Sequence, residues 1–175
     1  MQPVSASSPE NRENTGSDAR AAEIRARAGE ANINEKTLLA TDYLNHFNEF
    51  VMVLDLIPDM PDCLADAEAW QPKDYRAHFR DSAFSARELA IEAYAYAPAE
   101  YREQFEFLVD SINALIPKGL ERVRAAVDEG NAERVGFACT TTSQTLRKLI
   151  DLVSAVINGE KPTIDQQGID ALLER

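Results

Sequence analysis

The sequence predicts an all-α protein, an antiparallel four-helix bundle built on a long helical hairpin. Three observations support this fold class. Apolar residues recur every three or four positions from about residue 35 to residue 158, which is helical spacing. No stretch alternates apolar and polar residues as a half-buried strand does. Two helical patterns, about 98–128 and 131–158, are long and separated only by DEGN, so they should fold back on each other.

The first helix is expected over residues 35–57. PDMPD then ends it, because proline lacks the amide hydrogen that a continuing helix needs. Residues 62–97 should hold shorter helical pieces that connect this helix to the hairpin. The seam of the first helix steps by four and three residues and consists of Leu39, Tyr43, His46, Phe50, Val53 and Ile57.

The two long helices of the hairpin are each expected to be about 40 Å long, at about 1.5 Å per residue. Pro98 falls in the opening turn of the first, where proline is favoured. Pro117 lies inside the same helix and should kink or split it. Gly130 should end this helix, and Asn131 should cap the next one. The seam of the second helix is Val135, Cys139, Thr142, Leu146, Leu149, Val153 and Val156.

The chain divides into three parts. Residues 1–33 are expected to be a disordered or frayed N-terminal tail, since the start is rich in Ser, Asn, Glu and Pro. The stretch DARAAEIRARAGEA within it has good helix formers but only a thin apolar stripe, which indicates a frayed or partner-dependent helix. Residues 34–159 form the helical bundle. Residues 160–175 form a linker and a short amphipathic C-terminal helix.

Composition limits the classes of partner. Thirty acidic residues against eighteen basic ones give a formal charge of −12. This charge argues against nucleic acid and anionic membranes, which both attract Lys and Arg. The longest apolar run, FVMVLDLI, is far too short to span a bilayer, and the N-terminus has no signal-peptide pattern. We therefore expect a cytoplasmic protein, with Cys63 and Cys139 as free thiols.

Both histidines lie in a repeated pattern, DYLNHF and DYRAHF. On a helix Asp42 and His46 share a face, Glu49 follows one turn later, and Asp74 and His78 repeat the geometry. Such a set could bind iron, manganese or zinc, so a metal-binding bundle is one alternative. The other is structural, because both sites lack the Glu three residues before the His that is typical of di-iron bundles. We expect no metal and no cofactor.

The second long helix should expose a polar stripe with one aromatic residue. With Thr142 facing the core, a step of about 100° per residue places six residues on the opposite face. They are Glu133, Phe137, Thr140, Gln144, Arg147 and Asp151. Phe137 would stand in solvent unless a protein partner, the fourth helix or a second copy of the chain covers it.

The C-terminal segment IDQQGIDALL resembles the N-terminal peptide of the flagellar switch protein FliM, whose usual form is Leu-Ser-Gln-x-Glu-Ile-Asp-Ala-Leu-Leu. That peptide binds the chemotaxis response regulator CheY as a short helix in a groove. The resemblance implies a CheY-like partner that contacts Ile169, Asp170, Leu172 and Leu173. The alternative is that the segment caps the end of its own bundle. The matching residues are Ile164, Gln166, Ile169, Asp170, Ala171, Leu172 and Leu173.

The segment QTLRKLI in the second long helix is similar to the CheY phosphatase family CheZ. In that family an Asp and a Gln four residues apart lie on an exposed helix face and precede a basic and apolar run. The resemblance implies that Gln144 positions the attacking water. We expect Phe137 and Arg147, on the exposed stripe, to contact the partner. The sequence departs from the family at Thr140, where the acid should be, and at Ser143, where the family has glycine.

The CheZ family also shares the expected architecture of a dimeric four-helix bundle, a linker and a C-terminal CheY-binding helix. The sequence therefore predicts a homodimeric regulatory bundle that binds a CheY-like response regulator through its tail. Dephosphorylation of that regulator is a further expected activity. A metal-binding bundle and a non-catalytic structural adaptor are the alternatives.

Overall fold

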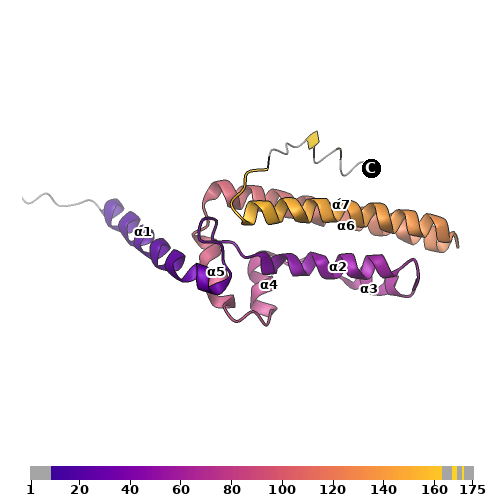
Figure 1. The fold of residues 1–175 in the computed structure, drawn as a ribbon, viewed down its shortest axis with the longest axis horizontal. Helices are drawn as coiled ribbons and strands as arrows, with labels where there is room; N and C mark the ends of the chain where they lie inside the picture. Colours follow the sequence, from indigo (N-terminus) through magenta and orange to yellow (C-terminus); the bar gives the residue numbers. More distant parts are fainter. Residues whose placement is uncertain (1–8, 163–166, 169–170, 172–175) are drawn as a thin grey trace, which may run out of the picture.

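The computed structural model describes residues 9–162, 167–168 and 171. Within these ranges every regular element is a helix and no residue lies in a strand, which confirms the all-α class (Figure 1). The elements in chain order are α1 Pro9–Ala28, η1 Gly29–Ala31, η2 Thr41–Leu44, α2 Asn45–Leu56, α3 Cys63–Ala69, α4 Tyr75–Asp81, α5 Arg87–Ala95, α6 Ala99–Asp128 and α7 Ala132–Ile157; η1 and η2 are 3₁₀ helices.

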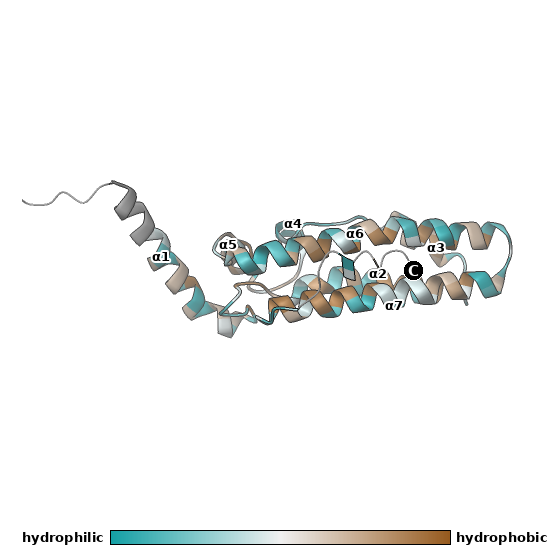
Figure 2. Ribbon diagram, turned by 90° about the horizontal axis from the view of Figure 1, so that it is seen from above, coloured by the Kyte–Doolittle hydropathy of each residue, from teal (hydrophilic) through white to brown (hydrophobic). Residues whose placement is uncertain are grey.

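The two long helices, α6 and α7, form the predicted antiparallel hairpin and lie side by side in Figures 1 and 2. Gly130 in the connection has a φ of 66°, a conformation that glycine adopts without steric cost. The side chain of Asn131 accepts a hydrogen bond of 3.0 Å from the backbone N–H of Arg134. The turn is therefore built as the sequence predicts.

The hairpin helices come closest where Gly119 of α6 faces Thr142 of α7. A Cβ atom on Gly119 would lie only 2.3 Å from Cγ2 of Thr142. Thr142, Ser143 and Thr145 are all buried, so small hydroxyl residues fill this narrow contact. The Thr145 hydroxyl donates to the backbone carbonyl of Thr141 at 3.0 Å and is satisfied within its own helix.

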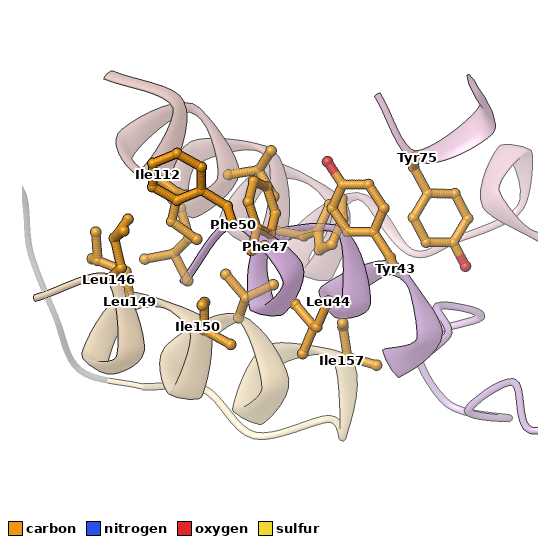
Figure 3. Close-up of a cluster of buried hydrophobic side chains, with 14 of the residues drawn as sticks. Tyr43, Leu44, Phe47, Phe50, Tyr75, Ile112, Leu146, Leu149, Ile150 and Ile157 are labelled. Atoms are coloured by element: carbon orange, nitrogen blue, oxygen red, sulfur yellow. The ribbon is translucent and has the colours of Figure 1, made fainter. Parts of the chain in front are cut away.

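Helix α2 packs along α7, and α3 packs against α2 and α6. The core between these elements combines aromatic side chains of η2 and α2 with aliphatic side chains of the hairpin (Figure 3). Such burial of large apolar side chains is the main stabilising contribution to the fold. The core side chains labelled in Figure 3 are Tyr43, Leu44, Phe47, Phe50, Tyr75, Ile112, Leu146, Leu149, Ile150 and Ile157.

The first predicted helix starts ten residues too early. Helix α2 begins at Asn45, directly after the 3₁₀ helix η2, and the segment before η2 is a loop in which Leu38 has a φ of 59°. The side chain of Asn34 accepts hydrogen bonds from the backbone N–H groups of Lys36 and Thr37. The Thr37 hydroxyl donates to the carbonyl of Ile157 at 2.6 Å. These bonds satisfy polar groups of the loop without a helix.

Of the two predicted effects of Pro117, a kink or a split, the split does not occur. Helix α6 continues from Ala99 to Asp128 with Pro117 inside it. The pyrrolidine ring is exposed, while Ile116 and Gly119 beside it are buried in the hairpin. Core packing on one face therefore outweighs the loss of one hydrogen bond on the other.

The N-terminal tail was expected to be disordered or frayed up to residue 33. Residues 1–8 lie outside the described residues, but 9–28 form α1, whose Ile24 and Ala28 are fully buried. Arg20 donates to Glu92 of α5 through a 2.7 Å hydrogen bond. In the described residues this part of the tail is a helix, and α5 of the same chain packs against it.

Among the residues described, no helix is both long and apolar enough to cross a membrane. Cys63, at the start of α3, and Cys139, in α7, are free thiols as predicted. Cys139 is buried, and this burial raises the pKa of its thiol to about 11.

Candidate functional site

The outer face of α7 presents the stripe that the helical spacing predicts. Phe137 is 73% exposed, so neither a fourth helix nor any other described part of the chain covers it. A large exposed aromatic side chain on a rigid helix is a good contact point for a protein partner. All six predicted stripe residues are exposed: Glu133, Phe137, Thr140, Gln144, Arg147 and Asp151.

Gln144 and Thr140 lie one turn apart near the middle of this face. The carboxamide of Gln144 offers two donors and one acceptor oxygen, which suits it to orient a water molecule. Thr140 supplies a hydroxyl where a carboxylate would be needed. The acidic residues of the same stripe, Glu133 and Asp151, are eleven and seven residues from Gln144, so about 10 Å or more separates them along the axis. On this stripe Gln144 has no acid beside it.

Arg147 joins α7 to α2 through a 2.6 Å ion pair with Asp55. The pair is exposed, so it contributes little to stability, but it holds the two helices' outer faces next to each other. On the α2 side of this contact Met52 and Leu56 are 65% and 45% exposed, and Met60 just beyond the helix is 48% exposed. Sequence reasoning missed this apolar strip, since it lies off the predicted seam.

The four tail residues predicted to bind a partner, Ile169, Asp170, Leu172 and Leu173, lie outside the described residues. Their described neighbours Gln167, Gly168 and Ala171 are helical. The linker before them is anchored to the rest of the fold. Lys36 donates to the carbonyl of Gly159 at 2.8 Å. Lys161 and Glu100 form a 2.6 Å ion pair.

The two DYxxHF segments pack against each other. The rings of His46 and His78 lie 5.9 Å apart, and the ring of Tyr43 lies 5.5 Å from those of Tyr75 and His78. The Tyr75 hydroxyl accepts a hydrogen bond from the backbone N–H of Ala40 at 2.9 Å. The residues of the repeated pattern thus form an aromatic cluster through which α4 packs against η2 and α2.

A polar pocket of about 480 Å³ opens beside the histidines. Nε2 of His46 accepts a hydrogen bond from the backbone N–H of Lys73 at 3.0 Å, and the ring stacks on Trp70. Burial, with smaller contributions from His78 and Lys73, lowers the pKa of His46 to about 4. Burial also lowers the pKa of His78, although a hydrogen bond to the backbone of Asp42 opposes the shift. Both rings are therefore neutral at pH 7.

The proposed metal ligands do not assemble into a ligand set. The Asp74 carboxylate caps α4 by accepting from the backbone N–H of Ala77 at 2.8 Å. The Nε2 atom of His46 already has its backbone donor. Within the part of the chain that the structure describes, no group of three or more His, Cys, Asp or Glu side chains could hold a metal ion.

No protein-family model, curated protein or solved structure matches this chain. Function is therefore inferred from the residues and the geometry described above.

Proposed function

We propose that the chain is a regulatory helical protein that binds a CheY-like response regulator through its C-terminal segment. One observation carries the proposal. In the described residues the apolar core ends at Ile157, ahead of the anchored linker and the amphipathic segment. An amphipathic segment placed after that core and its linker suits recognition of a partner.

The segment suits a helix-in-groove contact. Ile169, Leu172 and Leu173 stand at i, i+3 and i+4, the spacing of anchors on one helix face. Asp170 adds a charge at the edge of this face. The resemblance of IDALL to the CheY-binding peptide of FliM identifies the receiver domain of a response regulator as the partner class.

The outer face of α7 supports a second element of the proposal. With the tail bound, a receiver domain would reach the exposed stripe, where Phe137 offers an apolar contact and Arg147 a charged one. Gln144 would then orient water toward the aspartyl phosphate for in-line attack at phosphorus, as glutamine does in other phosphoryl transfers. Thr140 supplies no acid, so positioning of water is the whole contribution of this face.

The four-helix bundle and the homodimer belong to the same proposal. The pair α2 and α3 with the hairpin would make the bundle, and the strip Met52, Leu56 and Met60 would form the dimer contact. Light scattering should give a dimer for the native chain and a monomer for Leu56→Lys. A monomeric native chain would end the dimer proposal.

The tail is tested by binding of the full-length chain to a receiver domain activated with beryllofluoride. The double variant Ile169→Asp with Leu173→Asp should bind at least about 100-fold more weakly, because each lost anchor is worth about 1.5–3 kcal/mol. Gln167→Ala, a change to an exposed tail residue, is the matched control and should bind as the native chain does. Unchanged binding by the double variant would refute the proposal.

The role of Gln144 is tested by the rate of loss of phosphate from the receiver domain. Gln144→Ala should lower the stimulated rate at least about tenfold while binding is kept. Glu133→Ala, on the same stripe but eleven residues away, should leave the rate unchanged. If the native chain binds without stimulating dephosphorylation, it acts as an adaptor.

A further inference from the structure

Two hollows lie along the α6–α7 hairpin; we call the strip of helix surface that includes them the hairpin groove. At its base Gln104, Phe107 and Leu108 of α6 line a small hollow together with Pro162. Near the hairpin turn a hollow of about 460 Å³ is lined by residues of both helices, among them Arg122 and Phe137. The helical step of about 100° places both hollows on one strip of α6.

The contacts of α2 and α3 lie on other faces of the hairpin. Arg124 of α6 pairs with Glu68 of α3. Arg124 lies about 160° around α6 from Arg122, which lines the upper hollow. Arg147 of α7 pairs with Asp55 of α2, about 180° around the helix from Ala138 in the upper hollow. Helices α2 and α3 therefore contact the hairpin away from the groove.

The edges of the hairpin groove are basic, in a chain whose formal charge is −12. Lys118 and Arg122 of α6 and Lys148 of α7 are exposed along it. Among the described residues none of these three cations takes part in a salt bridge. The groove thus has an acidic, apolar ligand as its complement.

The C-terminal segment 163–175 has this chemistry. Its apolar residues Ile169, Leu172 and Leu173 are flanked by the acids Asp165, Asp170 and Glu174. The segment starts at Pro162, which already lines the lower hollow. There the Oε1 atom of Gln104 is buried and has no hydrogen-bond partner in the described residues.

The reach of the segment matches the groove. Four extended residues after Pro162 and a helix from residue 167 to 173 span about 24 Å. The seventeen helical steps from Leu108 to Ala125 also span about 25 Å. Leu172 and Leu173 therefore reach the upper hollow beside Phe137.

The described part of the segment lies on the corresponding side. In Figure 1 the short yellow piece Gln167–Gly168 lies on the opposite side of the hairpin from α2 and α3, and in Figure 2 it falls between α6 and α7. Gln167 and Ala171 are exposed. On a helix both lie about 160° from Ile169, which leaves the apolar face for the groove.

We propose that the C-terminal segment docks as a helix in the hairpin groove of its own chain. Leu172 and Leu173 sit beside Phe137, and the acids face Lys118, Arg122 and Lys148. A segment tethered at Pro162 has an effective concentration in the millimolar range. Any partner of the tail, including the receiver domain proposed above, must displace it from this groove.

The test uses a fluorescent peptide of residues 162–175 and full-length protein. The double variant Leu172→Asp with Leu173→Asp releases its own tail and should bind the peptide. The native chain, whose groove is occupied, should bind it at least about tenfold more weakly. In the double-variant background Lys118→Glu and, separately, Phe137→Ala should weaken binding at least about fivefold. Arg80→Glu makes the same kind of charge change at an exposed position elsewhere and should leave binding unchanged.

Three results would overturn the proposal. One is equal affinity of the peptide for the native chain and the double variant, and another is the absence of binding to either. The third is a native dimer that the double variant dissolves into monomers, which would assign the groove to the tail of a second copy. Because no receiver domain is used, none of these results bears on the proposed partner.

Discussion

Gly119→Ala tests whether the hairpin depends on the close approach of its two helices. The added Cβ would lie 2.3 Å from Cγ2 and 2.9 Å from Oγ1 of Thr142, and 3.2 Å from its Cβ. Rotation of Thr142 about χ1 does not remove the conflict, because the distance to Cβ stays short. The helices must therefore separate at this point, with loss of contact along the hairpin.

The cost can be worked out from two opposing effects. Overpacking of a well-filled interface costs about 1–3 kcal/mol, and an approach of 2.3 Å places this site in the upper half of that range, at about 2–3 kcal/mol. Alanine is better than glycine in a helix by about 1 kcal/mol. The free energy of unfolding should fall by about 1–2 kcal/mol. At a denaturant slope of about 2 kcal/mol/M, the urea midpoint should fall by about 0.5–1 M.

Gly136→Ala is the matched control, since it lies in α7 and a Cβ there would meet nothing within 4 Å. It should raise the free energy of unfolding by about 0.5–1 kcal/mol. Urea unfolding followed by circular dichroism at 222 nm measures both variants. In a double-mutant cycle, Gly119→Ala should cost less when Thr142 is replaced by alanine. A Gly119→Ala protein as stable as the native one would show that the contact does not limit packing.

Two further predictions concern stability. Thr37→Val removes the donor to the Ile157 carbonyl and should lower the free energy of unfolding in urea by about 1–3 kcal/mol. The exposed control Thr140→Val should change it by less than about 0.5 kcal/mol. Equal effects of the two substitutions would contradict the role of the hydrogen bond. The fold lowers the pKa of His46 to about 4. Between about pH 4 and 6.5 the unfolded chain therefore binds more protons at this residue than the folded chain does. The free energy of unfolding should fall as the pH drops through this window, by up to about 3 kcal/mol. Urea unfolding at pH 7 and pH 5 should show a smaller loss for His46→Gln than for the native chain, with His78 contributing the remainder in the same direction; an identical loss would exclude His46 as its source.

The hairpin could be predicted because its signals are local. The apolar seams determine which face of each helix is buried, and Gly130 and Asn131 determine the turn between the helices. The structure has the hairpin and the turn that these signals predict. The start of α2 could not be predicted, because Thr37 finds its partner 120 residues away at Ile157. The same holds for α1, which needs α5 to bury Ile24.

In the candidate site, too, local features could be predicted from the sequence and contacts between distant segments could not. Exposure of Phe137 and Gln144 follows from the helical period of one segment. The pattern DYxxHF correctly singled out two residues that meet, His46 and His78, but it could not show that Nε2 of His46 is bonded to the backbone of Lys73. The hairpin groove was beyond sequence reasoning, because its walls come from two helices and depend on which face α2 and α3 leave open.

The contrast between the two cysteines makes the native chain suitable for labelling at a single site. Cys139 is buried with a thiol pKa of about 11, so almost none of it is the reactive thiolate at neutral pH. Cys63 is partly exposed at the start of α3, on the side of the hairpin away from the groove. A maleimide dye should therefore attach at Cys63, away from the groove, without an engineered cysteine background.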